Sequence, residues 1–179
     1  MSIRILVVVH NASPGTPTME LASHWASRLG GSVVGLGVVD ESTALPAPMV
    51  AGGAAGMGGI VMSDNEALRA KADKAVAEAL RELGKQCEEK GVSYRDSQQS
   101  GVPQECVLLE AQRHDVVLLG RPATPDPDFG IPARTIFEDI LRNSPRPVVA
   151  VPGHIQTGEG ILVAYDGSLQ GPSPSSLGR

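Results

Sequence analysis

Residues 135–152 read TIFEDILRNSPRPVVAVP, and this stretch combines the start of a helix with an apolar strand. Thr135, with Glu138 three residues later, has the form of a capping box, whose side chains satisfy free N–H groups at a helix N-terminus. We therefore predict a helix over residues 135–143 with Thr135 as its N-cap. The apolar run from Pro147 to Val151 predicts a strand that follows this helix almost at once.

The rest of the chain continues this alternation of strands and helices. Apolar runs predict strands over residues 3–9, 32–39 and 115–119, and a more polar run predicts an edge strand over 92–99. Helical spacing predicts helices over 17–29, with Thr16 as N-cap, and over 103–113. A second capping box at Ser63 and Glu66 predicts a long helix that ends at Gly91. Strands that alternate with helices predict a doubly wound parallel sheet of the α/β class.

Composition excludes several classes of protein. Hydrophobic residues make up 41 % of the chain but aromatic residues only 3 %, so the core must consist of aliphatic side chains. The net charge of −5 gives no support to binding of nucleic acid or an anionic membrane, because both favour basic surfaces. Cys87 and Cys106 form no CxxC motif, and Cys87 continues an apolar helical stripe, which predicts a packed core thiol.

The apolar start of the chain has the length of a strand, too short for a signal peptide or a membrane span. We therefore expect a cytoplasmic protein with reduced thiols. A long segment after residue 41 contains Pro46, Pro48 and five glycines between Gly52 and Gly59, which predicts irregular structure. It is either a lid over a site or a solvated loop.

Ligands of doubly wound sheets bind beyond the carboxyl ends of the strands, where the strand order reverses. The loops to consider therefore follow Val9, Val39 and Leu119. A helix N-terminus after the third of these loops would attract phosphate, and Arg121 and Arg134 could add charge. Several residues of the same loop oppose such a site, through missing N–H groups or negative charge: Pro122, Pro125, Pro127, Pro132, Asp126 and Asp128.

His10 stands where the first predicted strand ends. A histidine beside this crevice could act as an acid, a base or a pH switch, with Asp40 as a conceivable partner. The alternative is a partly exposed loop histidine, and it is favoured because the sequence pairs no Ser or Cys nucleophile with His10. The four histidines of the chain show no metal-ligand spacing, so we expect no metal site.

Four stretches of the chain resemble the universal stress protein family. They are IRILVVV at 3–9, VVGLGVVDE at 33–41, DVVLLGR at 115–121 and the stretch at 135–152 quoted above. The resemblance covers residues 3–153. It implies a five-stranded parallel sheet in the order 3-2-1-4-5, a Rossmann-like fold of the adenine nucleotide alpha hydrolase type. It also implies a homodimer through the strand from Pro147 to Val151 and, in many members, ATP between the loops after the first and fourth strands.

The nucleotide site that the resemblance implies is degenerate in this chain. ATP-binding members carry Gly-x2-Gly-x9-Gly-Ser/Thr, whereas here Ala123 follows Gly120 at the second position. The third glycine falls on Ala133 or Arg134, and an aspartate after the first strand is replaced by His10. The resemblance places nine residues at this degenerate site: Val9, His10, Asn11, Val39, Gly120, Arg121, Ala123, Arg134 and Thr135.

A second copy of the first strand begins at Gly160. The run from Ile161 to Tyr165 repeats the apolar pattern, and Asp166 corresponds to His10. The chain thus resembles the first half of a tandem universal stress protein, followed by a linker over 154–159, a remnant strand and loop over 160–168, and an unstructured tail over 169–179. We expect the apolar run to pair with an existing sheet edge or, as the favoured alternative, with a dimer partner.

We therefore expect a non-enzymatic stress-response module that acts through dimerisation and through contacts with an unidentified protein. No cofactor is required in this interpretation. The alternative is an ATP-binding switch that uses magnesium and hydrolyses ATP slowly. A hydrolase that uses His10 is a third and weaker alternative, because no nucleophile or metal cluster accompanies that residue.

Overall fold

The computed structural model describes residues 2–10, 16–40, 58–120 and 133–154. The strands are β1 (Arg4–His10), β2 (Ser32–Asp40), β3 (Ser93–Gly101), β4 (Val116–Gly120) and β5 (Val148–Val151). The helices are α1 (Thr16–Leu29), α2 (Gly58–Glu89), α3 (Pro103–Ala111) and α4 (Ala133–Asn143). Residues 155–179 lie outside the described residues, so most of the predicted linker and all of the predicted remnant strand and tail stay predictions.

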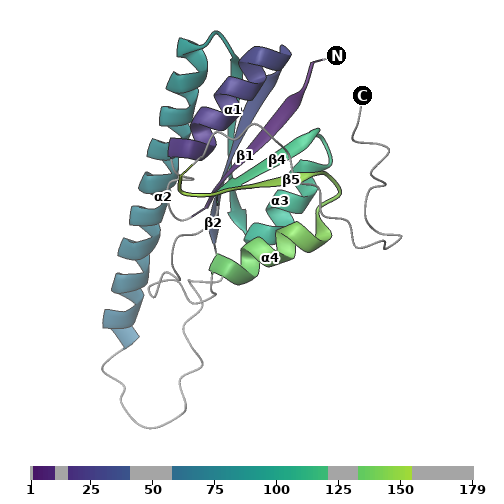
Figure 1. Ribbon diagram of the computed structural model, residues 1–179. Helices are drawn as coiled ribbons and strands as arrows, with labels where there is room; N and C mark the ends of the chain where they lie inside the picture. Colours follow the sequence, from purple (N-terminus) through teal and green to yellow (C-terminus); the bar gives the residue numbers. More distant parts are fainter. Residues whose placement is uncertain (1, 11–15, 41–57, 121–132, 155–179) are drawn as a thin grey trace.

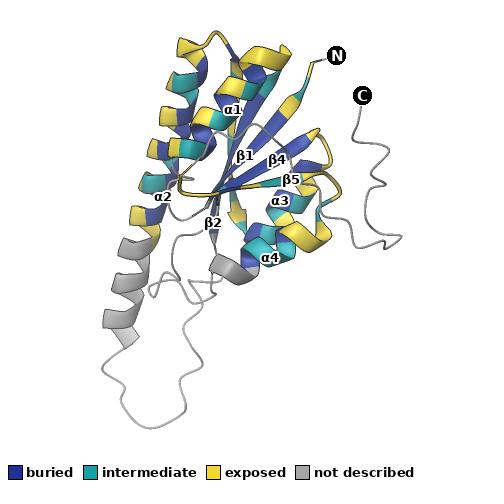
Figure 2. Ribbon diagram, viewed as in Figure 1, coloured by how far each residue is buried: buried dark blue, intermediate teal, exposed yellow. Residues whose placement is uncertain are grey.

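The five strands form one parallel sheet in the order β3-β2-β1-β4-β5, as the sequence resemblance implied. Helices α1 and α2 cover one face of the sheet, and α3 and α4 cover the other (Figure 1). Alternate residues of β1 divide between the two cores. Ile5, Val7 and Val9 pack beneath α1 and α2, and Leu6 and Val8 pack beneath α3 and α4. Figure 2 shows the central strands as the most deeply buried part of the molecule.

Three helices begin at other residues than the sequence predicted. Helix α2 begins at Gly58 and α4 at Ala133, so Ser63 and Thr135 lie inside their helices and are not N-caps. Helix α1 includes Thr16 as its first residue. The glycines at 58 and 59 also belong to α2, which shortens the segment predicted to be irregular. Each residue added to an existing helix gains a hydrogen bond, so a capping pattern marks a boundary only where the preceding chain cannot be helical.

Helix α2 approaches the sheet closely because β2 carries glycines beneath it. A Cβ atom added at Gly37 would lie 2.5 Å from Val76 Cγ1 and 2.9 Å from Leu80 Cδ1. Gly35 faces the same helix, and a Cβ there would lie 2.8 Å from Leu80 Cδ2. The absence of two side chains from β2 thus lets α2 pack directly against the backbone of the strand.

Tyr94 of β3 also packs against α2, next to the contact between α2 and β2. Its hydroxyl donates a hydrogen bond of 2.8 Å to the carbonyl oxygen of Leu80. Its ring lies against Gly84, where a Cβ would meet the ring carbon Cε1 at 2.8 Å. Burial raises the pKa of the Tyr94 hydroxyl above its ordinary value, with smaller contributions from Asp96 and Cys87. The hydroxyl therefore stays protonated and available as a donor.

Candidate functional site

The strand order reverses between β1 and β4. Chain leaving the carboxyl end of β1 leads to α1 on one face, whereas chain leaving β4 leads to α4 on the opposite face (Figure 1). The two strands pair directly, with Val8 opposite Leu119. The residues that end them, His10 and Gly120, therefore lie at the same edge of the sheet, which is where doubly wound folds bind ligands.

Two of the predicted site residues contribute only backbone to this edge. Val9 is fully buried and Val39 is 2 % exposed, and both side chains belong to the core beneath α1 and α2. Gly120 ends β4 and is half-buried, so its backbone is the part of β4 closest to a ligand. Val9, Val39 and Gly120 thus contribute strand-end backbone, and no functional side chain, to the floor of the candidate site.

The first turn of α4 supplies the second part of the candidate site. Helices of this sheet run antiparallel to the strands, so α4 begins at the carboxyl edge and contains Arg134 and Thr135 in its first turn. Ile136, the next residue, packs in the same core as Val8 and Leu119. The free N–H groups of that turn carry partial positive charge. Backbone donors from α4 therefore accompany the ends of β1 and β4.

Asn11, Arg121 and Ala123 lie outside the described residues, and so does most of the loop that joins β4 to α4. Within the described part of the chain, no three His, Cys, Asp or Glu side chains gather closely enough to hold a metal ion. In the same residues, no helix is long and apolar enough to cross a membrane. What the described edge does offer is the backbone N–H groups in the first turn of α4, a type of group that can bind anions.

Comparison with solved structures decides the fold. Hypothetical protein MJ0577 is 19 % identical, with a TM-score of 0.58, over 85 % of this chain and 96 % of that one. A universal stress protein family protein from Arabidopsis thaliana, solved with AMP bound, is 17 % identical, with a TM-score of 0.55, over 85 % and 92 %. Universal stress protein UspA from Lactobacillus plantarum is 17 % identical, with a TM-score of 0.54, over 83 % and 97 %. The chain has the fold of the universal stress proteins.

Neither a protein-family model nor a curated protein sequence matches the chain. The universal stress protein fold, the parallel sheet and its strand order confirm what the four sequence stretches implied about architecture. The degenerate nucleotide site, its nine residues and the tandem arrangement remain predictions. Cys87 is fully buried in the core of this universal stress protein fold, as its helical spacing predicted, and burial raises its pKa to about 11 against a smaller opposing effect of Lys90.

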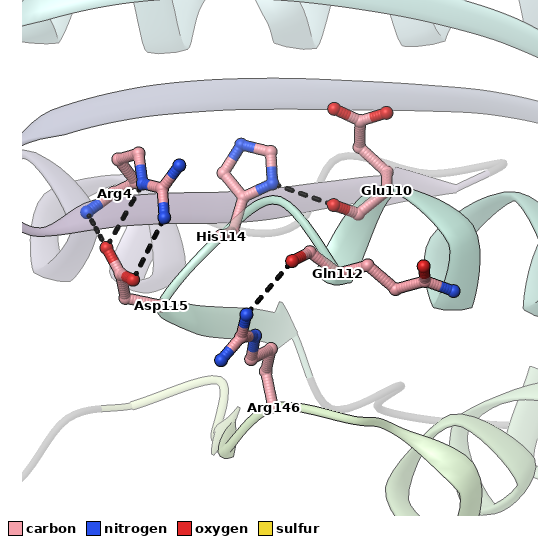
Figure 3. Close-up of polar contacts among 6 residues, drawn as sticks. All are labelled: Arg4, Glu110, Gln112, His114, Asp115 and Arg146. Carbon is pink, nitrogen blue, oxygen red and sulfur yellow. Dashed lines mark hydrogen bonds and ion pairs between the residues drawn. The ribbon is translucent and has the colours of Figure 1, made fainter.

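The amino edge of this universal stress protein fold carries a polar cluster that the sequence did not reveal (Figure 3). Arg4 Nε donates to Asp115 Oδ2 at 3.3 Å, and Arg4 Nη2 lies 3.3 Å from Asp115 Oδ1. These hydrogen bonds lower the pKa of the Asp115 carboxyl. His114 is 3 % exposed, and its Nδ1 lies 2.8 Å from the carbonyl oxygen of Glu110. The cluster ties β1 to β4 at the edge opposite the candidate site, so its role is structural.

Proposed function

We propose that this chain is a cytoplasmic module of the universal stress type, which acts through self-association and contacts with other proteins and binds adenine nucleotides weakly. The observation that carries the proposal is the fold, which the chain shares with solved universal stress proteins. Three universal stress proteins with this fold were solved with cAMP, AMP or dAMP bound. Those nucleotides belong to the other proteins, and they define what a functional site in this fold can bind.

The residues of this chain argue for a weak site. His10 occupies the position that the family resemblance assigns to an aspartate, and Ala123 stands in place of a glycine. The loop before α4 also contains four prolines, which cannot donate hydrogen bonds to phosphate. The ATP-binding switch remains the second candidate, because the first turn of α4 lies at the same edge as Gly120 and offers free N–H groups.

Titration with ATP, with and without magnesium, separates the two candidates. We expect a dissociation constant no tighter than roughly 100 μM, which corresponds to about 5.5 kcal/mol. The double substitution His10→Asp with Ala123→Gly restores the family's residues and should tighten binding at least tenfold. His24→Asp is the matched control, because His24 is exposed on α1, away from the site. Micromolar affinity in the unaltered chain, or a nucleotide retained through purification, would favour the ATP-binding switch.

Self-association is proposed at β5, the short edge strand. Val148 and Val149 are half-buried and Ala150 is exposed, although the strand is apolar. The carbonyl of Pro147 accepts a hydrogen bond of 3.0 Å from the Val117 N–H, so this carbonyl points toward β4. Backbone groups of successive strand residues alternate in direction. The N–H and C=O groups of Val148 and Ala150 therefore point away from the sheet and are available to another strand.

A second copy would use these four groups most simply across a two-fold axis. Antiparallel pairing would join Val148 of each copy to Ala150 of the other and place Val149 opposite its own counterpart. Such a central pair does not exchange hydrogen bonds, and its Cα atoms lie about 4.5 Å apart in antiparallel strands. That separation suits a disulfide.

We therefore expect Val149→Cys to give a disulfide-linked dimer on mild oxidation, with the 149–149 bridge identified by peptide mass spectrometry. Val149→Asp should instead yield only monomers in sedimentation velocity, because the two carboxylates would face each other at the axis. Val102→Asp is the control, since Val102 is 39 % exposed and lies before α3. An assembly that survives Val149→Asp unchanged would contradict the β5 interface.

A further inference from the structure

β5 carries an apolar side chain on each face of the sheet that the described elements leave only partly covered. Val149 is partly buried and packs against the core beneath α1 and α2. Val148 packs in the same way against the core on the opposite face. A strand placed beside β5 could therefore bury apolar side chains on both faces while it pairs with the N–H and C=O groups of Val148 and Ala150.

The chain itself supplies an apolar strand shortly after β5. Residues 161–165 read ILVAY, and the nine residues 152–160 connect this run to Val151. Two neighbouring antiparallel strands need a connection of only two to five residues, so this linker is long enough for the run to return beside β5. A tether of this length also holds the run at an effective concentration in the millimolar range. A second copy of the chain at micromolar concentration must compete for β5 with this higher effective concentration of the tethered run.

We propose that residues 161–165 pair antiparallel with the outer edge of β5 in the same chain and compete there with the second copy. This inference rests on the proposed function, because the edge that it regulates is the proposed dimer interface. Both partners satisfy the same four backbone groups of β5. The intrachain strand also removes Ile161, Leu162 and Val163 from water, which pairing of two β5 strands does not.

One antiparallel register allows both the backbone pairing with β5 and the burial of apolar side chains. With Val163 opposite Val149, Leu162 lies opposite Ala150 and Ala164 opposite Val148, so that a large side chain meets a smaller one at each hydrogen-bonded pair. Both residues of the central pair then lie on the face of the sheet that α1 and α2 cover. In this register Ile161 lies opposite Val151, the last residue of the strand.

Disulfide trapping in the full chain tests the pairing. Val149→Cys with Val163→Cys should form an intrachain bridge, so that oxidised protein at low micromolar concentration remains monomeric and gives the 149–163 cross-linked peptide. Val102→Cys with Val163→Cys is the matched control and should give no such bridge. A 149–163 bridge found only between chains would show that the strand is exchanged between copies and would overturn the intrachain proposal, as would the absence of any 149–163 bridge.

A negative charge introduced into residues 161–165 tests whether this run competes with a second copy of the chain for β5. Val163→Asp should lower the dimer dissociation constant at least tenfold, whereas Gln170→Asp, the same charge beyond the run, should leave it unchanged. If Val163→Asp has no effect on a dimer that does form, the competition is refuted and the β5 dimer stands. If the intrachain bridge forms but Val163→Asp gives no dimer at any concentration, the proposed dimer fails and the intrachain pairing stands alone.

Discussion

Valine in place of Gly37 is expected to lower the free energy of unfolding by about 3 kcal/mol, the upper range for an overpacked core. The Cβ atom alone would lie 2.5 Å from Val76 Cγ1, and valine adds two further methyl groups. Val76 and Leu80 are 1 % and 3 % exposed, so neither side chain can turn into solvent to make room. Helix α2 would have to move away from β2, which would loosen the contacts along the whole face.

Urea denaturation measures this effect, with Gly153→Val as the matched control. No atom of the described residues lies within 4 Å of a Cβ built at Gly153, so the same substitution there should change the free energy of unfolding by less than about 0.5 kcal/mol. A Gly37→Val chain that unfolds at the same urea concentration as the unaltered chain would show that α2 does not approach β2 as closely as the structure places it.

The thiol of Cys87 is expected to react with iodoacetamide at least 100-fold more slowly in the folded chain than in the unfolded chain. Burial raises its pKa from 9.0 to about 11, and each pKa unit lowers the thiolate population at neutral pH about tenfold. Because the thiolate is the reactive form, the shift alone accounts for a factor of roughly 100, and the full burial of Cys87 slows access further.

Peptide mass spectrometry of alkylated protein, with and without urea, gives the two rates at each cysteine. Cys106 is partly exposed and serves as the internal reference in the folded chain. The same pKa shift predicts the pH dependence of stability. Cys87 ionises near pH 9.0 when unfolded but not when folded, so its contribution is fully present below that pH and is lost as the pH rises toward 11. Equal alkylation rates at Cys87 in both states would contradict its place in the core.

The strands were the most predictable part of this fold. Continuous aliphatic runs can only be buried on both faces, so β1 and β4 could be located to within one residue from hydrophobicity alone. The polar composition of β3 likewise predicted its place at a sheet edge. Helix starts were less predictable, because the Ser63 and Thr135 patterns are compatible with both a cap and a helix interior.

Contacts between distant parts of the chain could not be predicted. Arg4 and Asp115 are 111 residues apart in sequence, and no local pattern marks either as the partner of the other. Likewise, the close packing that requires glycine at positions 35 and 37 of β2 involves Val76 and Leu80 of α2, which lie far away in the sequence. The candidate site could be placed from the strand order, because ligands of doubly wound sheets bind where that order reverses. Asn11, Arg121 and Ala123 belong to the connecting segments, for which sequence patterns predict little.

The two edges of the sheet differ in a way that limits how large an assembly can become. β3 is nine residues long, with exposed Arg95 and Asp96 that discourage pairing with another strand. β5 is four residues long and apolar, and Pro147 and Pro152 bound it. If copies pair through β5, each sheet has one edge that favours pairing and one that opposes it, so it would join a single neighbour. We therefore expect edge-to-edge pairing to end at two copies and not to continue into a filament.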